Sequence, residues 1–200
     1  MPIAKGEAWG APGDLPEGGV IVLSDAEAAA VLHAARNERR PFPALGLLGG
    51  DLRRTLGGGA SRGRELQGVR FTIDLGEALL DGRLHFFVAH LVARTRLWTR
   101  AFVAMNGQSV GDWNLGPRAH PNDGLLDTYD VHLPRGQLLA VRARLHHGAH
   151  LPHPDIKERR TAAMQIELDR PLPVRLDGVT SGKARVISVR VQPDALTVVI

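Results

Sequence analysis

The chain has 200 residues, no cysteine, a formal net charge of +4 and an isoelectric point of about 10.3. The lack of cysteine excludes a disulfide framework and thiolate chemistry, and it fits a reducing cytoplasm. Of the 25 basic residues 22 are arginine, scattered without the spacing of a helix-turn-helix, zinc-finger or RNA-recognition motif, so we expect no nucleic-acid partner.

The first part of the chain, residues 1–18, is rich in Gly, Pro and Ala and is expected to form an N-terminal arm. It has no apolar segment of the signal-peptide kind, and the run FFVAHLVA is too short to span a bilayer. We therefore expect a cytoplasmic protein without a transmembrane segment, with peripheral contact to an anionic membrane surface as one option.

The next segment, residues 19–58, predicts a short α/β lobe. Val20 to Leu23 form an apolar run typical of a buried parallel strand. Ser24 and Glu27 have the spacing of a capping box, which starts a helix of about a dozen residues. A second apolar strand over residues 44–48 completes a β-α-β unit, and a further helix begins after it.

From residue 69 onward the apolar residues alternate with period two, which indicates antiparallel strands. LHFFVAHLVA and RAFVAMN predict one strand each, and the ending RVISVRVQPDALTVVI predicts two short strands around a Gln-Pro-Asp turn. The glycine run GGGASRGREL, residues 57–66, marks the boundary, so residues 66–200 form the second lobe. The predicted fold class is α+β, with a short α/β lobe followed by an antiparallel β-sandwich.

A turn-rich segment at residues 116–131, GPRAHPNDGLLDTYDV, contains Asp123 within an Asn-Asp-Gly turn signal. It is either a reverse turn that sets strand register or part of a site. Nearby, Trp113 could line a pocket, although burial in a core or an interface is the simpler expectation for it and for Trp9 and Trp98.

The run HHGAHLPHP contains four histidines, whose neutral imidazoles would suit zinc, copper or nickel. Its two prolines predict an exposed loop. Specific metal binding and adventitious binding both stay open. The four residues are His146, His147, His150 and His153.

The order of these elements resembles the diacylglycerol and sphingosine kinase superfamily, including its bacterial lipid kinases. The resemblance runs over about residues 20–200 and is carried by VRFTIDLGEALLDGRLHFFVAHLV, by FVAMNGQSVGDWNLGPRAHPNDGLLDTYDV and by the ending with its Asp-Gly turn and QPDAL. It implies a nucleotide lobe followed by a β-sandwich lobe, with the active site between them.

The resemblance also implies which positions would contact nucleotide. VIVLSDAEAA stands at the family's glycine-rich phosphate loop, and LGLLGGDLRRTLGG is similar to a second nucleotide segment. In the first segment Asp25 is kept, but Ser24 and Glu27 stand where the family has glycine and threonine. The implied nucleotide-binding residues are Ser24, Asp25, Gly49, Gly50 and Asp51.

The same resemblance implies two more site residues. The family's Asp-Gly-Glu, which supplies the catalytic carboxylate, reads Asp177, Gly178, Val179 in this chain, so Asp177 is the nearest candidate for a general base. Asp123 matches an aspartate that joins a water and magnesium network in the family. Valine can neither accept a proton nor bind a metal, so we expect phosphotransfer to be slow.

These substitutions lead to three hypotheses about function. The first is a catalytically degenerate lipid-kinase-like protein that binds a lipid or another small ligand, or serves as a regulatory partner. The second is an active lipid kinase that uses ATP and Mg²⁺, with Asp25, Asp51 and Asp123 organising metal and phosphate and Asp177 as base. The third is an interaction protein without a ligand. Expected partners are a lipid or membrane surface and a second copy in a homodimer.

Overall fold

A computed structural model places residues 9–58 and 65–200 of the chain. The predicted arm at residues 1–18 and the predicted boundary at residues 57–66 therefore lie partly outside the described residues. The elements in chain order are β1 (Ala11–Pro12), β2 (Val20–Val22), α1 (Asp25–Asn37), β3 (Leu45–Leu47), α2 (Asp51–Thr55), β4 (Val69–Leu80), β5 (Arg83–Phe87), β6 (His90–Arg94), β7 (Ala101–Met105), β8 (Ser109–Val110), β9 (Trp113–Asn114), β10 (Leu126–Val131), η1 (Arg135–Gln137), α3 (Leu138–Leu145), β11 (Ile156–Thr161), β12 (Ala163–Leu176) and β13 (Val179–Val199).

A short α/β segment precedes a large antiparallel sheet, which confirms the predicted fold class. β2 and β3 pair in parallel, and α1 connects them, as the predicted β-α-β unit requires. β3 also pairs in parallel with the end of β13, where Leu45 faces Val198. The two parts of the fold therefore share one sheet, and their division into separate lobes stays a prediction.

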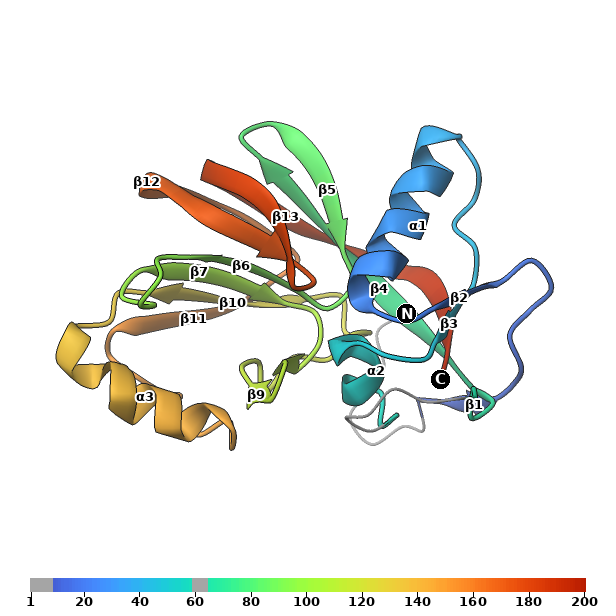
Figure 1. The fold of residues 1–200 in the computed structure, drawn as a ribbon, viewed down its shortest axis with the longest axis horizontal. Helices are drawn as coiled ribbons and strands as arrows, with labels where there is room; N and C mark the ends of the chain where they lie inside the picture. Colours follow the sequence, from blue (N-terminus) through green and yellow to red (C-terminus); the bar gives the residue numbers. More distant parts are fainter. Residues whose placement is uncertain (1–8, 59–64) are drawn as a thin grey trace.

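The sheet curls into two layers (Figure 1). In residues 9–58 and 65–200, the main sheet has eleven strands. Eight follow the order β1-β4-β13-β12-β6-β7-β10-β11, while β3 pairs with β13, β2 pairs with β3, and β5 pairs with β4. β12 and β13 lie over β6 and β7, and side chains such as Leu91, Phe102 and Ile187 form the apolar core between them. This closely packed apolar core forms a rigid support for the side chains on the outer faces of the sheet.

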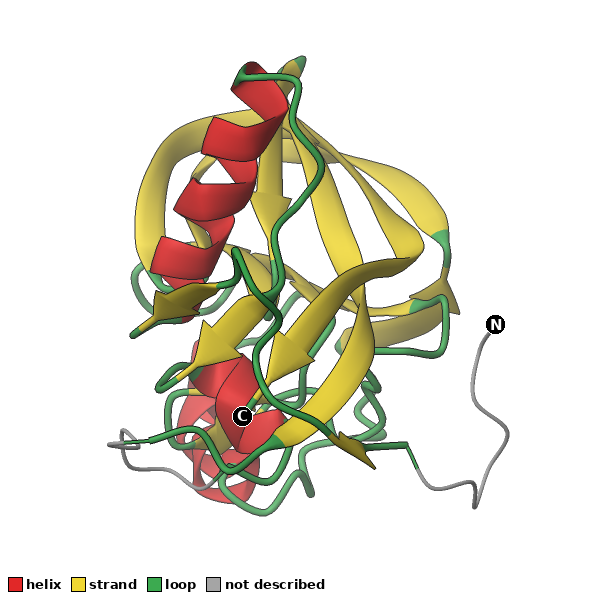
Figure 2. Ribbon diagram, turned by 90° about the vertical axis from the view of Figure 1, so that its right-hand side faces the viewer, coloured by secondary structure: helices red, strands yellow, loops and turns green. Residues whose placement is uncertain are grey.

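Two further apolar cores lie on the outside of the sheet, each under a helix. α1 runs along the sheet (Figure 2), and its Leu32 is fully buried with Ile73 and Val198. α3 covers β7, β10 and β11 with Val141 and Leu145. A pocket at the edge of either helix is therefore bounded by packed strands on one side.

Two strand predictions for the β-rich part are wrong. β13 is one strand of 21 residues rather than two short strands, because the Gln-Pro-Asp segment forms an irregularity within it between Gln192 and Leu196. LHFFVAHLVA is not one strand: β5 and β6 are separated at Val88 and Ala89. The backbone N–H groups at that break bond to a side chain instead of a neighbouring strand, as described below.

The segment after β10 corrects a third prediction. The sequence analysis did not predict α3, and it expected an exposed loop at His146 to His153. The loop is indeed largely exposed, as at His146 and His147, but His150 within it is only 4 % exposed. The longest helix, α1, has 13 residues, so within the described ranges no helix reaches the length and apolarity that a bilayer crossing needs.

Candidate functional site

The start of α1 is closed by its own side chains, as the capping-box spacing predicted. The Ser24 hydroxyl accepts a hydrogen bond from the Glu27 N–H at 3.2 Å. The Glu27 carboxylate accepts one from the Leu23 N–H at 2.7 Å, one residue further out than in the usual box. These donors, which a phosphate would need in a glycine-rich loop, are therefore already in use.

The start of α2 is closed by Asp25, which reaches it from the first turn of α1. The Asp25 carboxylate accepts hydrogen bonds from the N–H groups of Asp51 at 2.5 Å and of Leu52 at 3.3 Å. Gly50 precedes them with φ of 103°, and a Cβ at that position would collide with the Asp25 carboxylate. The glycine is thus required by the close approach of Asp25, which is only 4 % exposed.

Asp51 and His90 lie beside this contact. The Asp51 carboxylate accepts a hydrogen bond from the Gly111 N–H at 3.0 Å, and its Oδ2 lies 3.7 Å from His90 Nδ1. Burial, followed by the charge of Arg175, lowers the pKa of His90 to about 4, so the imidazole is neutral at neutral pH. Burial raises the pKa of Asp51 and, more strongly, that of Asp25, whose pKa Asp177 raises further.

Asp177 occupies the tight turn between β12 and β13. Asp177 and Gly178 both have positive φ, 49° and 81°, as a two-residue type I′ hairpin requires. The Asp177 carboxylate accepts hydrogen bonds from the N–H groups at the β5–β6 break, at 2.8, 2.9 and 3.0 Å. Burial raises the pKa of Asp177 to about 6, although these hydrogen bonds oppose the shift. The donors are Val88, Ala89 and His90.

A second Asp-Gly hairpin in the same sheet shows what such an aspartate does structurally. Asp81 and Gly82 also have positive φ, in the turn between β4 and β5. The Asp81 carboxylate accepts hydrogen bonds from the N–H groups of Arg185 and Val186. Asp177 differs from Asp81 mainly in its burial, so binding backbone N–H groups is sufficient to explain its position.

Asp123 belongs to a different network from Asp25, Asp51 and Asp177. Its carboxylate forms an ion pair with Arg160, which also binds Asp127 with 2.9 Å between Nε and Oδ1. Asp74 accepts a hydrogen bond from the Gly124 N–H at 2.7 Å and so fixes the same loop to the sheet. The guanidinium of Arg160 thus supplies the positive charge beside Asp123, and magnesium binding there stays a prediction.

Three of the four clustered histidines contact different groups. His146 Nδ1 lies 3.1 Å from the Asp112 carbonyl oxygen, and His153 Nδ1 accepts a hydrogen bond from the Asp155 N–H. His150 packs near Tyr129, with 6.5 Å between ring centroids. Across residues 9–58 and 65–200, no three His, Asp or Glu side chains are arranged to hold a metal ion.

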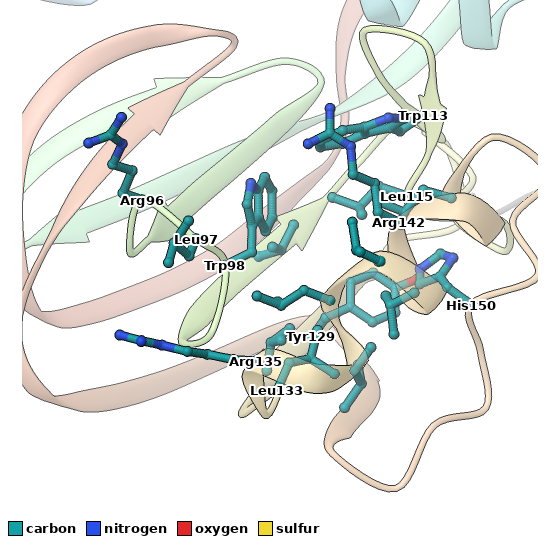
Figure 3. A pocket seen from close by; sticks show the side chains of 17 residues that line it. Arg96, Leu97, Trp98, Trp113, Leu115, Tyr129, Leu133, Arg135, Arg142 and His150 are labelled. Atoms are coloured by element: carbon teal, nitrogen blue, oxygen red, sulfur yellow. The ribbon is translucent and has the colours of Figure 1, made fainter.

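An apolar cavity of about 300 Å³ lies between α3 and the sheet (Figure 3). Its walls are aromatic and aliphatic side chains from β7, β10, α3 and the β6–β7 turn. Tyr129 and His150 are among its lining residues, and their hydroxyl and Nδ1 atoms are buried without a hydrogen-bond partner in the described part of the chain, although the His150 ring also bonds the Leu115 backbone. The other labelled lining residues are Arg96, Leu97, Trp98, Trp113, Leu115, Leu133, Arg135 and Arg142.

A second cavity, of about 650 Å³, connects this region to the carboxylates. Asp51 and His90 lie on its wall, with Arg94 and Arg175 further along. The two cavities share three lining residues: Trp98, Trp113 and Arg142. The two tryptophans, expected in a core or interface, are therefore half-buried walls between cavities.

The sequence analysis missed His90 and the arginines of the second cavity. The alternation His90, Val92, Arg94 along β6 places all three on one face, and this period-two signal could have identified them. α3 also had a signal, because Leu138, Val141 and Leu145 follow helical spacing.

The comparisons with known proteins agree on the fold. The family model described as "YegS C-terminal NAD kinase beta sandwich-like domain" matches residues 88–200. Three similar solved structures come from Bacillus anthracis strain Sterne. The first, provisionally described as a diacylglycerol kinase, has a TM-score of 0.67 and 16 % identity over 90 % of this chain and 77 % of its own.

A second structure with the same provisional description gives a TM-score of 0.63 and 15 % identity over the same shares. A third, described as a diacylglycerol kinase, gives 0.56 and 16 % over 79 % of this chain and 67 % of its own. No curated protein matches the chain. At these identities the structural likeness shows the fold, and the family match rests on the sequence of the β-rich part.

Proposed function

Because this chain belongs to the family of the YegS C-terminal NAD kinase beta sandwich-like domain, we propose that it is a lipid-kinase-like protein that binds a lipid or small apolar ligand without transferring phosphate from ATP. The observation that carries this proposal is the capped start of α1, where Ser24 and Glu27 occupy backbone N–H groups that a phosphate would need. The Asp25 carboxylate occupies two further N–H groups at the start of α2.

The electrostatic cost of a triphosphate supports the proposal. At about 4 Å and an effective dielectric constant near 20, one like-charge contact costs on the order of 4 kcal/mol before screening. Asp51 lies at this point beside Asp25, whose raised pKa reduces its own negative charge, and His90 carries no compensating charge at neutral pH. The residues present therefore do not fit ATP.

The state of the candidate base also supports loss of phosphotransfer. Asp177 is 8 % exposed, and its carboxylate already holds three backbone N–H groups. Val179, at the position of the family's glutamate, is 55 % exposed and has no group that accepts a proton. The α3 cavity, with its apolar walls, offers instead a place for an aliphatic chain.

One observation favours the second hypothesis, an active lipid kinase. A carboxylate with a pKa of about 6 lies in the range where a general base works well near neutral pH. Asp177 would then be the base, with Asp25 and Asp51 beside it.

Incubation of the pure protein with labelled ATP, Mg²⁺ and mixed lipid alcohols decides between the two. We expect no product above background. Turnover that disappears in Asp177→Asn would overturn the proposal, whereas turnover that persists in this variant comes from a contaminating kinase. Binding is then tested by thermal shift: we expect lipids to raise the melting temperature and ATP to leave it unchanged. The predicted homodimer is checked in the same preparation by light scattering.

A further inference from the structure

Three arginines around the second cavity lack a negative partner. Arg94, Arg142 and Arg175 form no ion pair with a carboxylate of the residues that the structure describes. Elsewhere in the fold Arg100 and Arg160 do find such carboxylates. The cavity wall therefore carries three guanidinium groups against the two carboxylates of Asp51 and Asp112.

The sheet places two of these arginines close together. Arg175 on β12 lies opposite Val92 on β6, and Arg94 follows two residues later on the same face of β6. Such diagonal neighbours are within reach of long side chains. Burial lowers the pKa of Arg94, and the charge of Arg175 lowers it further. An anion between the two guanidinium groups would remove this repulsion.

Two tryptophans hold the guanidinium groups at the boundary between the cavities. The Arg94 guanidinium lies over the Trp98 ring at 4.7 Å, and that of Arg142 lies over the Trp113 ring at 5.6 Å. The two rings meet edge to face at 5.7 Å. Trp98 has a φ of 60°, a conformation that is unfavourable for a bulky residue. The stack of Arg94, Trp98, Trp113 and Arg142 therefore includes a residue with a strained backbone.

On the other side of the stack lies the apolar cavity under α3, as Figure 3 shows. Arg142 lies beside Trp113 at the end that adjoins the second cavity, whereas Arg96 and Arg135 lie at the opposite end. A molecule across the stack would have apolar surroundings under α3 and the guanidinium groups of Arg94, Arg142 and Arg175 beyond the stack, while Arg96 and Arg135 stand at the far rim of the apolar cavity. Guanidinium groups bind phosphate and carboxylate in a two-pronged geometry.

We infer that the two cavities together bind a single-chain amphiphile with an anionic head, the aliphatic chain under α3 and the phosphate or carboxylate between Arg94, Arg142 and Arg175. This inference rests on the proposed binding function and adds the class of ligand. The apolar cavity, about 300 Å³, is at the lower end of the volumes typical of small-molecule sites, which favours one chain over two.

Isothermal titration calorimetry below the critical micelle concentration tests the inference with dodecyl phosphate, laurate, dodecanol and inorganic phosphate. Both anionic amphiphiles should bind at least tenfold more tightly than dodecanol, and inorganic phosphate should bind weakly or not at all. Dodecyl phosphate or laurate as the tighter ligand tells which head group the arginines favour.

Arginine variants locate the head group. Arg142→Gln and Arg175→Gln should each weaken dodecyl phosphate about tenfold and leave dodecanol unchanged. Arg144→Gln is the matched control, because this arginine is exposed on the same helix and lines neither cavity. Arg135→Gln tests the reverse orientation and should have no effect. All variants are first checked for unchanged circular dichroism and melting temperature.

The outcomes separate this inference from the proposed function. Equal binding of dodecanol and dodecyl phosphate, or a loss caused by Arg135→Gln in place of Arg142→Gln, overturns the head-group assignment and leaves apolar ligand binding intact. Binding of inorganic phosphate as tight as that of dodecyl phosphate overturns the amphiphile. Failure of every amphiphile to bind overturns both proposals, whereas ATP turnover overturns the proposed function alone.

Discussion

The starts of the two N-terminal helices and the region under α3 differ in whether their polar groups have hydrogen-bond partners. At the helix starts, Ser24, Glu27 and Asp25 use the backbone donors that a ligand would otherwise bind. Under α3, the Tyr129 hydroxyl and His150 Nδ1 are buried without partners. A site that satisfies itself gains stability and loses ligand affinity, whereas a site with unsatisfied groups gives up stability for binding. The comparison supports the α3 cavity as the place for the proposed ligand binding.

The strongest test of the self-satisfied region is removal of the Asp177 carboxylate. Asp177→Ala leaves three N–H groups at the β5–β6 break without an acceptor, at about 1 kcal/mol or more each. We expect the free energy of unfolding to fall by about 3 kcal/mol, measured by urea denaturation. The matched control is Asp81→Ala, which removes the same kind of turn aspartate from an exposed site with two donors, and should cost about 1 kcal/mol. Equal losses would show that burial of Asp177 contributes nothing.

Removal of the Asp25 carboxylate should break the comparison directly. Asp25→Ala leaves the N–H groups of Asp51 and Leu52 unpaired and should lower the free energy of unfolding by about 2 kcal/mol. Asp169→Ala, at an exposed position on β12, is the control and should change it little. If Asp25 is what excludes anions, ATP should raise the melting temperature of the variant and not of the parent. A variant as stable as the parent would refute the role of Asp25 as the cap of α2.

The buried imidazole of His90 should make the free energy of unfolding depend on pH. The unfolded chain protonates His90 near its ordinary pKa of about 6.5, whereas the folded protein does so only near 4. Between these values the unfolded state binds more protons, so this residue removes stability as the pH falls from about 6.5 to 4. His90→Asn abolishes this contribution. Its stability relative to the parent should therefore be about 2 kcal/mol more favourable at pH 5 than at pH 7.5.

Urea denaturation of both proteins at the two pH values measures this difference. Any effect of His90→Asn on packing is present at both pH values and cancels in the comparison. The same relative stability at pH 5 and pH 7.5 would show that the imidazole is not held neutral in the fold.

What the sequence could predict depended on how local each signal was. The capping box of Ser24 and Glu27 involves neighbouring residues, so its spacing predicted it, whereas the Asp-Gly turn at Asp177 came with the family resemblance. The contact of Asp25 with the start of α2 joins residues 26 positions apart, and local patterns carry no information about it. The Gln-Pro-Asp segment predicted a chain reversal, but pairing of β13 with β4 on both sides of it made it an irregularity in one strand.

The candidate site divides in the same way. The resemblance identified Asp25, Asp51 and Asp177, which the fold brings together, and Asp123, which joins a separate network with Arg160. The arginine and tryptophan stack escaped prediction because its members come from two hairpins, a helix and β12, and only the folded sheet aligns them.

The smallest expected effect comes from the unpaired polar groups under α3. Tyr129→Phe removes a hydroxyl that is buried without a partner and otherwise keeps the ring, which is 2 % exposed. Loss of an unpaired buried polar group is favourable, so the ligand-free variant should be more stable than the parent by about 1 kcal/mol in urea denaturation. A ligand that hydrogen-bonds this hydroxyl offsets part of that gain, because the ligand loses the hydrogen bond in the variant. The difference in stability should therefore shrink when dodecyl phosphate is present. A destabilised ligand-free variant would mean that the hydroxyl is already satisfied, and the α3 cavity would then resemble the helix starts instead of contrasting with them.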